Sequence, residues 1–70
     1  MEYRNVREQV TDQIRAELLL GKFKAGEAMR EIPLAERFNV SRGPVRDALL
    51  QLSQEGLLEF TPNRGSRVGK

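Results

Sequence analysis

Apolar residues recur at every fourth position along the first part of the chain. The positions are Val6, Val10, Ile14 and Leu18, and charged or polar residues separate them. A spacing close to 3.6 residues is typical of a helix that buries one face, so we predict an amphipathic helix over about residues 4–20. Gly21 follows directly and predicts its end, because glycine readily takes the left-handed conformation found there.

A loop and a short second helix come next. Residues 22–27 predict the loop, with Phe23 as its apolar anchor. A helix is expected from about Pro33 to Phe38, since proline is tolerated in the first turn of a helix. Its inner face should comprise Leu34, Ala35 and Phe38. Asn39 predicts the end of this helix, because asparagine tolerates the left-handed conformation.

The pattern then predicts a third helix with one fully apolar face. Ser41 is a favourable N-cap residue and Pro44 falls in the first turn. The i, i+3, i+4, i+7 spacing of a buried helix face is met by Val45, Ala48, Leu49 and Leu52. The helix should end near Gly56.

After Gly56 the apolar period changes to two. Leu58 and Phe60 alternate with polar residues, which predicts a half-buried strand. Residues 62–65 (Pro-Asn-Arg-Gly) predict a turn, and residues 66–68 a returning strand. The predicted fold is mainly α with a small β-hairpin: three helices plus a wing, the winged helix-turn-helix, as one domain over residues 1–70.

Composition adds limits to the chemistry. Hydrophobic residues make up 39% and charged residues 31% of the 70, which is typical of a globular domain. The chain has neither cysteine nor histidine, so it offers no disulfide, and a zinc site would need carboxylates alone. We find no catalytic constellation or nucleotide-binding motif and expect no enzyme activity, cofactor or metal. Without a membrane span or signal peptide, we expect a cytoplasmic protein.

The net charge of +2 is small, but the positive charge is unevenly distributed. Residues 41–46 and 61–70 hold five basic residues and no acidic one, whereas the rest of the chain has an acidic excess. This pattern indicates a surface that meets an anionic partner, most commonly a phosphate backbone.

The start of the third helix suits that partner. A helix N-terminus offers unpaired N–H groups and partial positive charge, and Ser41 can add a hydroxyl group. Arg42 and Arg46 lie one turn apart, where each can bind guanine or phosphate, and Gly43 permits close approach. In the hairpin, Arg64 beside Gly65 can reach a minor groove, and Arg67 and Lys70 can meet phosphates.

At these residues the chain resembles the GntR family of bacterial transcriptional regulators, and within it the FadR-like subgroup. Residues 34–49 read LAERFNVSRGPVRDAL, residues 21–27 read GKFKAGE, and residues 63–68 read NRGSRV. The resemblance implies a winged helix-turn-helix that binds double-stranded DNA, with the helix at 41–56 in the major groove and the wing at 61–68 at the minor groove. It implies DNA contacts at Ser41, Arg42, Gly43, Pro44, Arg46, Asn63, Arg64 and Gly65.

Three features depart from the family pattern. Asn39 replaces the more usual glycine of the turn, and Ile32 replaces an arginine that touches DNA in some relatives. The third departure is length: the family usually continues into an effector-binding domain that also dimerises, and nothing follows Lys70 here. We therefore expect the chain to be the N-terminal domain of a longer regulator, which binds a palindromic operator as a homodimer. A small-molecule effector would act only through that further domain. A repressor is the expected form, although an activator would show the same residues.

Other readings of the same residues stay open. Arg42 and Arg46 could be ordinary solvated residues, with Arg46 paired to a carboxylate such as Glu36. Arg64 and Arg67 could simply protect a strand edge from aggregation. A winged helix that binds protein is the alternative function, because a fold alone does not fix function.

Overall fold

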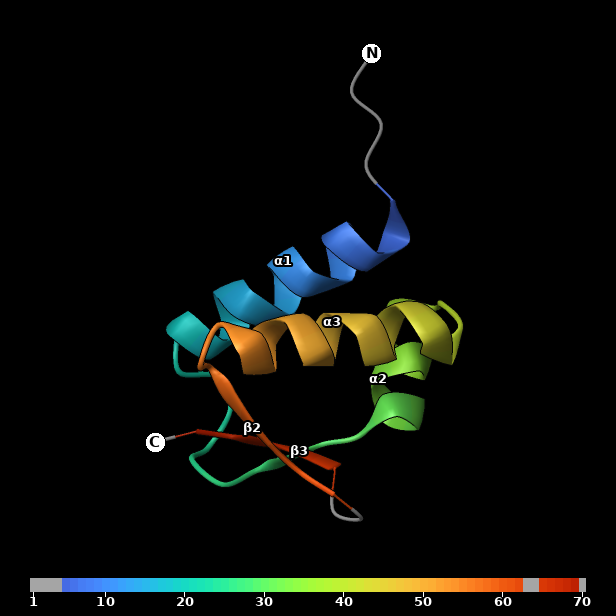
Figure 1. Cartoon of the computed structure of the whole chain (residues 1–70). Helices are drawn as coiled ribbons and strands as arrows, with labels where there is room; N and C mark the ends of the chain where they lie inside the picture. The colour runs from blue at the N-terminus through green and yellow to red at the C-terminus, as the bar shows by residue number, and fades with distance from the viewer. Residues whose placement is uncertain (1–4, 63–64, 70) are drawn as a thin grey trace.

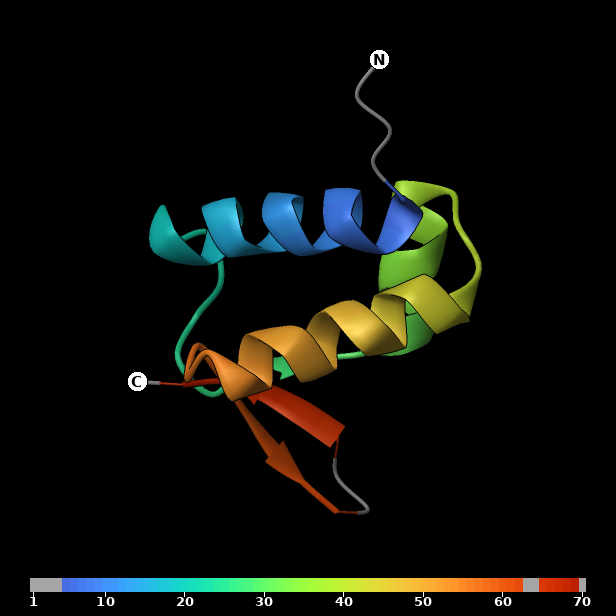
Figure 2. The ribbon, with the colours of Figure 1, turned by 45° about the horizontal axis from the view of Figure 1, so that its top comes forward.

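The structure is a computed structural model that describes residues 5–62 and 65–69. Its helices are α1 (Val6–Leu19), α2 (Glu31–Phe38) and α3 (Arg42–Gln54), and its strands are β1 (Ala28–Met29), β2 (Leu58–Thr61) and β3 (Gly65–Val68). Helix α3 lies between α1 on one side and the β2–β3 hairpin on the other (Figure 1). The hairpin projects away from α1 (Figure 2). Three helices followed by this hairpin confirm the predicted winged helix-turn-helix.

The C-terminal ends of α1 and α2 follow the predicted local chemistry closely. Helix α1 begins after Asn5, whose side chain accepts a hydrogen bond of 2.8 Å from the Glu8 N–H, and Gly21 follows it at φ 76°. Helix α2 begins at Glu31, two residues before the predicted start, so Pro33 still falls in its first turn. Asn39 adopts the left-handed conformation (φ 58°), as predicted, and so confirms its role in the turn between α2 and α3.

The third helix confirms its predicted span and its predicted N-cap residue, but not a capping hydrogen bond. Ser41 occupies the N-cap position with extended backbone, yet its side chain makes no capping hydrogen bond. Helix α3 ends at Gln54, and Gly56 follows at φ 85°. The Ser41 hydroxyl group is therefore not engaged by the start of its own helix.

The sheet has a third strand that the sequence pattern did not predict. The strand order is β1-β3-β2, and both pairings are antiparallel. Strand β1 is only two residues long and pairs Ala28 with Arg67 and Met29 with Ser66. Two residues are too few to show a period, which is why the pattern missed this strand. It ties the start of α2 to the wing.

One apolar core joins all three helices to the sheet. Helix α3 supplies the residues predicted for its buried face, and α1 and α2 pack their own stripes against it. The buried hydrophobic residues are Val10, Ile14, Met29, Leu34, Ala35, Val45, Ala48, Leu49, Leu52 and Leu58. Phe23, Phe38 and Leu18 pack against them at partial burial, so Phe23 anchors its loop as predicted.

Two predicted core residues are exposed instead. Val6 is 43% exposed because it occupies the first position of α1, at the edge of the helix packing. Phe60 is 57% exposed, although it lies two residues after the buried Leu58 on the same strand. The hairpin projects beyond the helices (Figure 2), and Phe60 lines a hollow instead of joining the core.

Two ion pairs fasten the helices to each other. Arg37 of α2 donates two hydrogen bonds to the Glu17 carboxylate of α1, one of them 2.8 Å long. Arg15 of α1 similarly holds Glu55 at the end of α3, with an Nε to Oε1 distance of 2.9 Å. Both arginines therefore stabilise the packing of the helices.

No helix in the described part of the chain is long and apolar enough to cross a membrane.

Candidate nucleic-acid interface

The basic start of α3 lies exposed at one end of the helix-turn-helix. Ser41, Arg42, Gly43 and Arg46 are exposed, and Pro44 is half-buried. The buried face of the same helix, which includes Val45 and Ala48, orients them outward by packing into the core. The structure thus brings together the five residues predicted on this segment.

The N-terminus of α3 also has a distinct electrostatic setting. Helix α1 has a capping side chain and Glu8 in its first turn, and α2 has Glu31 in its first turn. The first turn of α3 has no acidic residue and no side-chain cap. Its N–H groups and positive dipole end are therefore not neutralised by a side chain of that turn.

The side chain of Arg46 has one weak partner among the described residues. Its Nε lies 3.6 Å from Oε2 of Glu31, beyond hydrogen-bonding distance, and the side chain is 59% exposed. The alternative expectation, that Arg46 pairs with a nearby carboxylate, is confirmed for Glu31 in the first turn of α2, whereas Glu36, the residue suggested for it, is wrong. An exposed ion pair of this kind contributes little to stability, so an anionic ligand can displace Glu31 readily.

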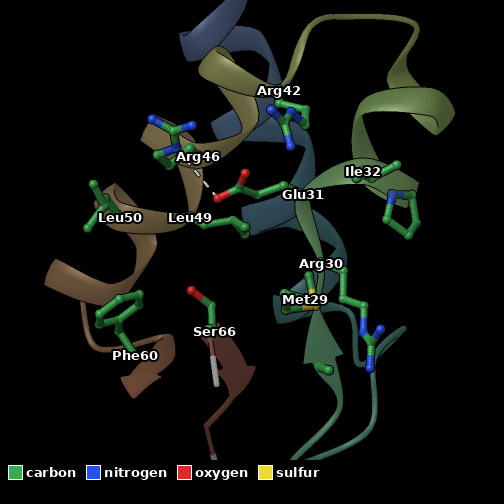
Figure 3. Close-up of a pocket in the computed structure, with 13 residues that line it drawn as sticks. Met29, Arg30, Glu31, Ile32, Arg42, Arg46, Leu49, Leu50, Phe60 and Ser66 are labelled. Carbon is green, nitrogen blue, oxygen red and sulfur yellow. Dashed lines mark ion pairs between the residues drawn. The ribbon is translucent and has the colours of Figure 1, made fainter. Parts of the chain in front are cut away.

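Between α3, the wing and the start of α2 lies a hollow of about 480 Å³, which we call the α3–wing hollow. Figure 3 shows Arg42 and Arg46 on its α3 side and Ser66 of β3 pointing into it. Arg30, Arg42 and Arg46 line it, with Glu31 as the one carboxylate among the described residues of the lining. This hollow joins the two elements that were predicted separately, the helix start and the wing.

Arg30 was missed by the sequence analysis. It is exposed, occupies the N-cap position of α2 and lies at the edge of the α3–wing hollow (Figure 3). Its segment, residues 27–31, reads Glu-Ala-Met-Arg-Glu, so acidic neighbours hide it in any count of charge along the chain. Only the pairing of β1 with β3 places it near the wing.

The wing residues divide into two groups. Gly65 lines the hollow and adopts φ 80°, a conformation that favours glycine, directly after the turn. Arg67 does not line the hollow. In the sheet it lies opposite Ala28 of β1 and Glu59 of β2, and its Nη1 donates a 3.1 Å hydrogen bond to the Gly26 carbonyl oxygen. The predicted contacts Asn63, Arg64 and Lys70 lie outside the described residues.

The fold of the domain does not require glycine at position 43. A Cβ atom added there would meet nothing within 4 Å, and its φ is not in the positive range. Neither packing nor backbone conformation within the domain therefore selects glycine at this position.

The described residues also contain no cluster of three or more acidic side chains suited to a metal.

Comparison with known proteins places the chain in a family. The family model described as "Bacterial regulatory proteins, gntR family" matches residues 6–68. The chain is 37% identical over 65 residues to the transcriptional repressor RspR of Escherichia coli K12, covering 93% of this chain and 28% of RspR. It is 47% identical over 57 residues to the regulator Mce2R of Mycobacterium tuberculosis, covering 80% of this chain and 24% of that protein. The chain thus spans about a quarter of the length of these relatives.

Solved structures agree with the fold. A GntR family regulator from Pseudomonas syringae pv. tomato superposes with a TM-score of 0.83 at 36% identity, covering 91% of this chain and 27% of that one. The N-terminal domain of AraR, crystallised in complex with mutant ORR3, gives 0.80 at 28% identity over 97% of this chain and all of the AraR chain. The resemblance to the FadR-like subgroup remains a prediction. By its family model and its relatives, the chain belongs to the gntR family of bacterial regulatory proteins.

Proposed function

We propose that this domain binds double-stranded DNA sequence-specifically and reads the operator of a bacterial transcription regulator. The start of α3 enters the major groove, and the wing lies at the neighbouring minor groove. The observation that carries the proposal is the exposed start of α3, where Arg42 and Arg46 project beside N–H groups that no side chain caps. Such a surface suits phosphates and base edges together.

The residues divide the work between positioning and reading. The free N–H groups of α3 and the Ser41 hydroxyl group bind a phosphate, which fixes the depth of the helix in the groove. Arg46, released from Glu31, and Arg42 direct their guanidinium groups at guanine edges, where two parallel hydrogen bonds identify the base. Gly43 and Pro44 keep this approach free of large side chains.

The wing extends the contact along the duplex. Gly65 allows the turn to approach the DNA backbone closely, and Asn63 and Arg64 are the residues that we propose to reach the minor groove. Arg67 is proposed to meet a phosphate in the complex, which requires it to leave the Gly26 carbonyl group. Arg30, at the opposite edge of the α3–wing hollow, is added as a further phosphate contact.

The wider role follows from the family. We propose that the domain acts as one half of a homodimer on a palindromic operator in the cytoplasm, since a single half-site offers few phosphate contacts. A repressor is the form favoured by the likeness to RspR. A dimerising effector-binding domain, as the family resemblance implies, would carry the response to a small molecule.

The test is a set of binding measurements with Arg46→Ala on duplexes selected from a random pool. We expect the variant to lose about 1–3 kcal/mol of discrimination at one base pair and little elsewhere, because one side chain reads one base. Lys24→Ala is the matched control: this exposed cation does not line the α3–wing hollow and should leave discrimination unchanged. Unchanged discrimination in Arg46→Ala would remove that residue from the proposed reading.

The alternative, a winged helix that binds protein, makes a different prediction. It requires binding to a protein partner that salt does not weaken, together with no selection of any DNA sequence. The arginine lining of the hollow favours DNA, because guanidinium groups suit the phosphate backbone. DNA binding should then weaken steeply with salt, because phosphate contacts release counterions.

A further inference from the structure

Exposed apolar side chains gather around the two arginines of α3. Six large hydrophobic residues are exposed in the described part of the chain, and three of them line the α3–wing hollow: Ile32 (54% exposed), Leu50 (46%) and Phe60 (57%). Single exposed apolar residues are ordinary on protein surfaces, but these three line the same hollow as Arg42 and Arg46.

Two of these residues belong to the helix-turn-helix itself. Arg42, Arg46 and Leu50 are spaced four residues apart and so share one side of α3, while Ile32 lies in the first turn of α2. In the view of Figure 3 the two arginines lie between Ile32 and Leu50. Neither apolar residue belongs to the buried core. The domain's own packing therefore gives no reason for an apolar side chain at either position.

The chemistry of the major groove supplies a reason for apolar side chains at these two positions. Base edges there present hydrogen-bonding groups and a single apolar group, the C5-methyl of thymine. The minor groove presents no methyl group, so Phe60, on the wing, has no such counterpart in the proposed complex. An apolar side chain beside base-reading arginines therefore has thymine as its natural match.

We propose that Ile32 and Leu50 are specificity-determining residues that contact thymine methyl groups beside the base pairs read by Arg42 and Arg46. The inference rests on the proposed DNA binding and deepens it. It predicts a half-site in which thymines flank the positions read by arginine. Burial of a methyl group against these side chains favours thymine over the same base without its methyl group.

The experiment removes only that methyl group. Tight-binding duplexes are first selected from a random pool, and each thymine of the selected half-site is then replaced by deoxyuridine, one position at a time. We expect at least one replacement to weaken binding by about fourfold, the effect of one buried methyl group. Affinities are measured by fluorescence anisotropy at one fixed salt concentration.

Protein variants then assign the contact. Ile32→Ala and Leu50→Ala should each remove the preference for thymine over deoxyuridine at one position, and both should keep the melting temperature of the parent within a few degrees because the side chains are exposed. Leu20→Ala is the matched control, since Leu20 is 72% exposed and does not line the hollow. It should retain the full preference.

Equal affinity for thymine and deoxyuridine at every position would overturn the inference. Loss of affinity in Leu50→Ala that is the same for both duplexes would also overturn it, because that result shows a contact that does not involve the methyl group. If the substitutions alter only the sedimentation of the free domain, the apolar pair serves a second copy and the inference fails. In each case, salt-dependent selection of a DNA sequence would leave the proposed function standing, whereas absence of selection would reject both.

Discussion

Gly43 and Gly56 are both glycines at helix ends, but the structure gives them opposite reasons for being glycine. Gly56 follows α3 with φ 85°, a conformation in which a side chain is strained. Gly43 has no positive φ and open space around its missing Cβ. The first glycine serves the fold, and the second serves the surface that we propose meets DNA.

Gly43→Ala should therefore separate stability from binding. We expect the variant to be more stable by about 0.5 kcal/mol, because alanine restricts the unfolded chain, and to bind the selected duplex more weakly. Thermal unfolding and anisotropy titrations measure the two effects. Gly56→Ala is the control and should lose about 1–2 kcal/mol of stability. An alanine variant at 43 that binds DNA as tightly as the parent would contradict the close approach at this residue.

Arg30 provides a second test on a single residue, one that sequence order did not suggest. Arg30→Ala should weaken binding to all duplexes alike, because a phosphate contact carries no sequence information. The slope of log affinity against log salt concentration should become shallower by about 1. Arg46→Ala should differ by changing discrimination between duplexes. Loss of affinity for one sequence alone in Arg30→Ala would show a base contact instead.

At the level of elements, α1 and α2 are held by a carboxylate that is nearly inaccessible. Glu17 is 6% exposed, and Arg37 holds both of its oxygens while Gln13 donates a further hydrogen bond of 2.7 Å. The Arg37 hydrogen bonds lower the pKa of Glu17, against the opposing effect of burial. Arg37→Ala would leave this buried carboxylate without its main partner.

Arg37→Ala should consequently destabilise the domain by about 1–2 kcal/mol, a value reduced because the arginine side chain is half exposed. Urea unfolding measures the change. Asp47→Ala, which removes an exposed charge of α3 away from this contact, should change stability by less than about 0.5 kcal/mol. Equal stability of the Arg37 variant and the parent would show that the pair contributes nothing to helix packing.

The same ion pairs make the stability of the domain depend on pH. Hydrogen bonds from Arg15 and Gln51 lower the pKa of Glu55 from 4.5 to about 2, and Glu17 is lowered as well. A carboxyl group whose pKa is lower in the folded state is protonated first in the unfolded chain, so acid favours unfolding. Stability should fall as the pH drops from about 5 towards 2. Glu55→Gln should reduce that fall, as followed by thermal melting at several pH values, and an identical pH profile would contradict this role of Glu55.

The elements themselves were largely predictable, because each has a strong local signal. The apolar spacing of α3 and the left-handed residues Gly21 and Asn39 defined the helices to within two residues. Strand β1 escaped because it is defined by its partner β3 and not by its own residues. Phe60 was misassigned because alternation shows which face a residue shares, but not where the core ends along a strand.

For the whole molecule, the sequence indicated two separate basic segments, and the fold places the start of α3 and the strands of the wing around one hollow surface. The α3–wing hollow adds Arg30 and a set of exposed apolar residues to that surface, both of which depend on contacts between distant segments. Arg15 and Arg37 are equally basic, yet interhelical ion pairs hold them within the fold. Charge counts along the chain cannot distinguish these two groups of arginines.

The most direct test of the account is an NMR titration of the isotope-labelled domain with a short palindromic duplex at two salt concentrations. We predict amide shifts clustered at residues 41–46 and 63–67 and near Arg30, with smaller shifts at the higher salt concentration, because phosphate contacts release counterions. Shifts confined to α1, or no clustered shifts at low salt in a folded sample, would contradict the proposed DNA-binding surface.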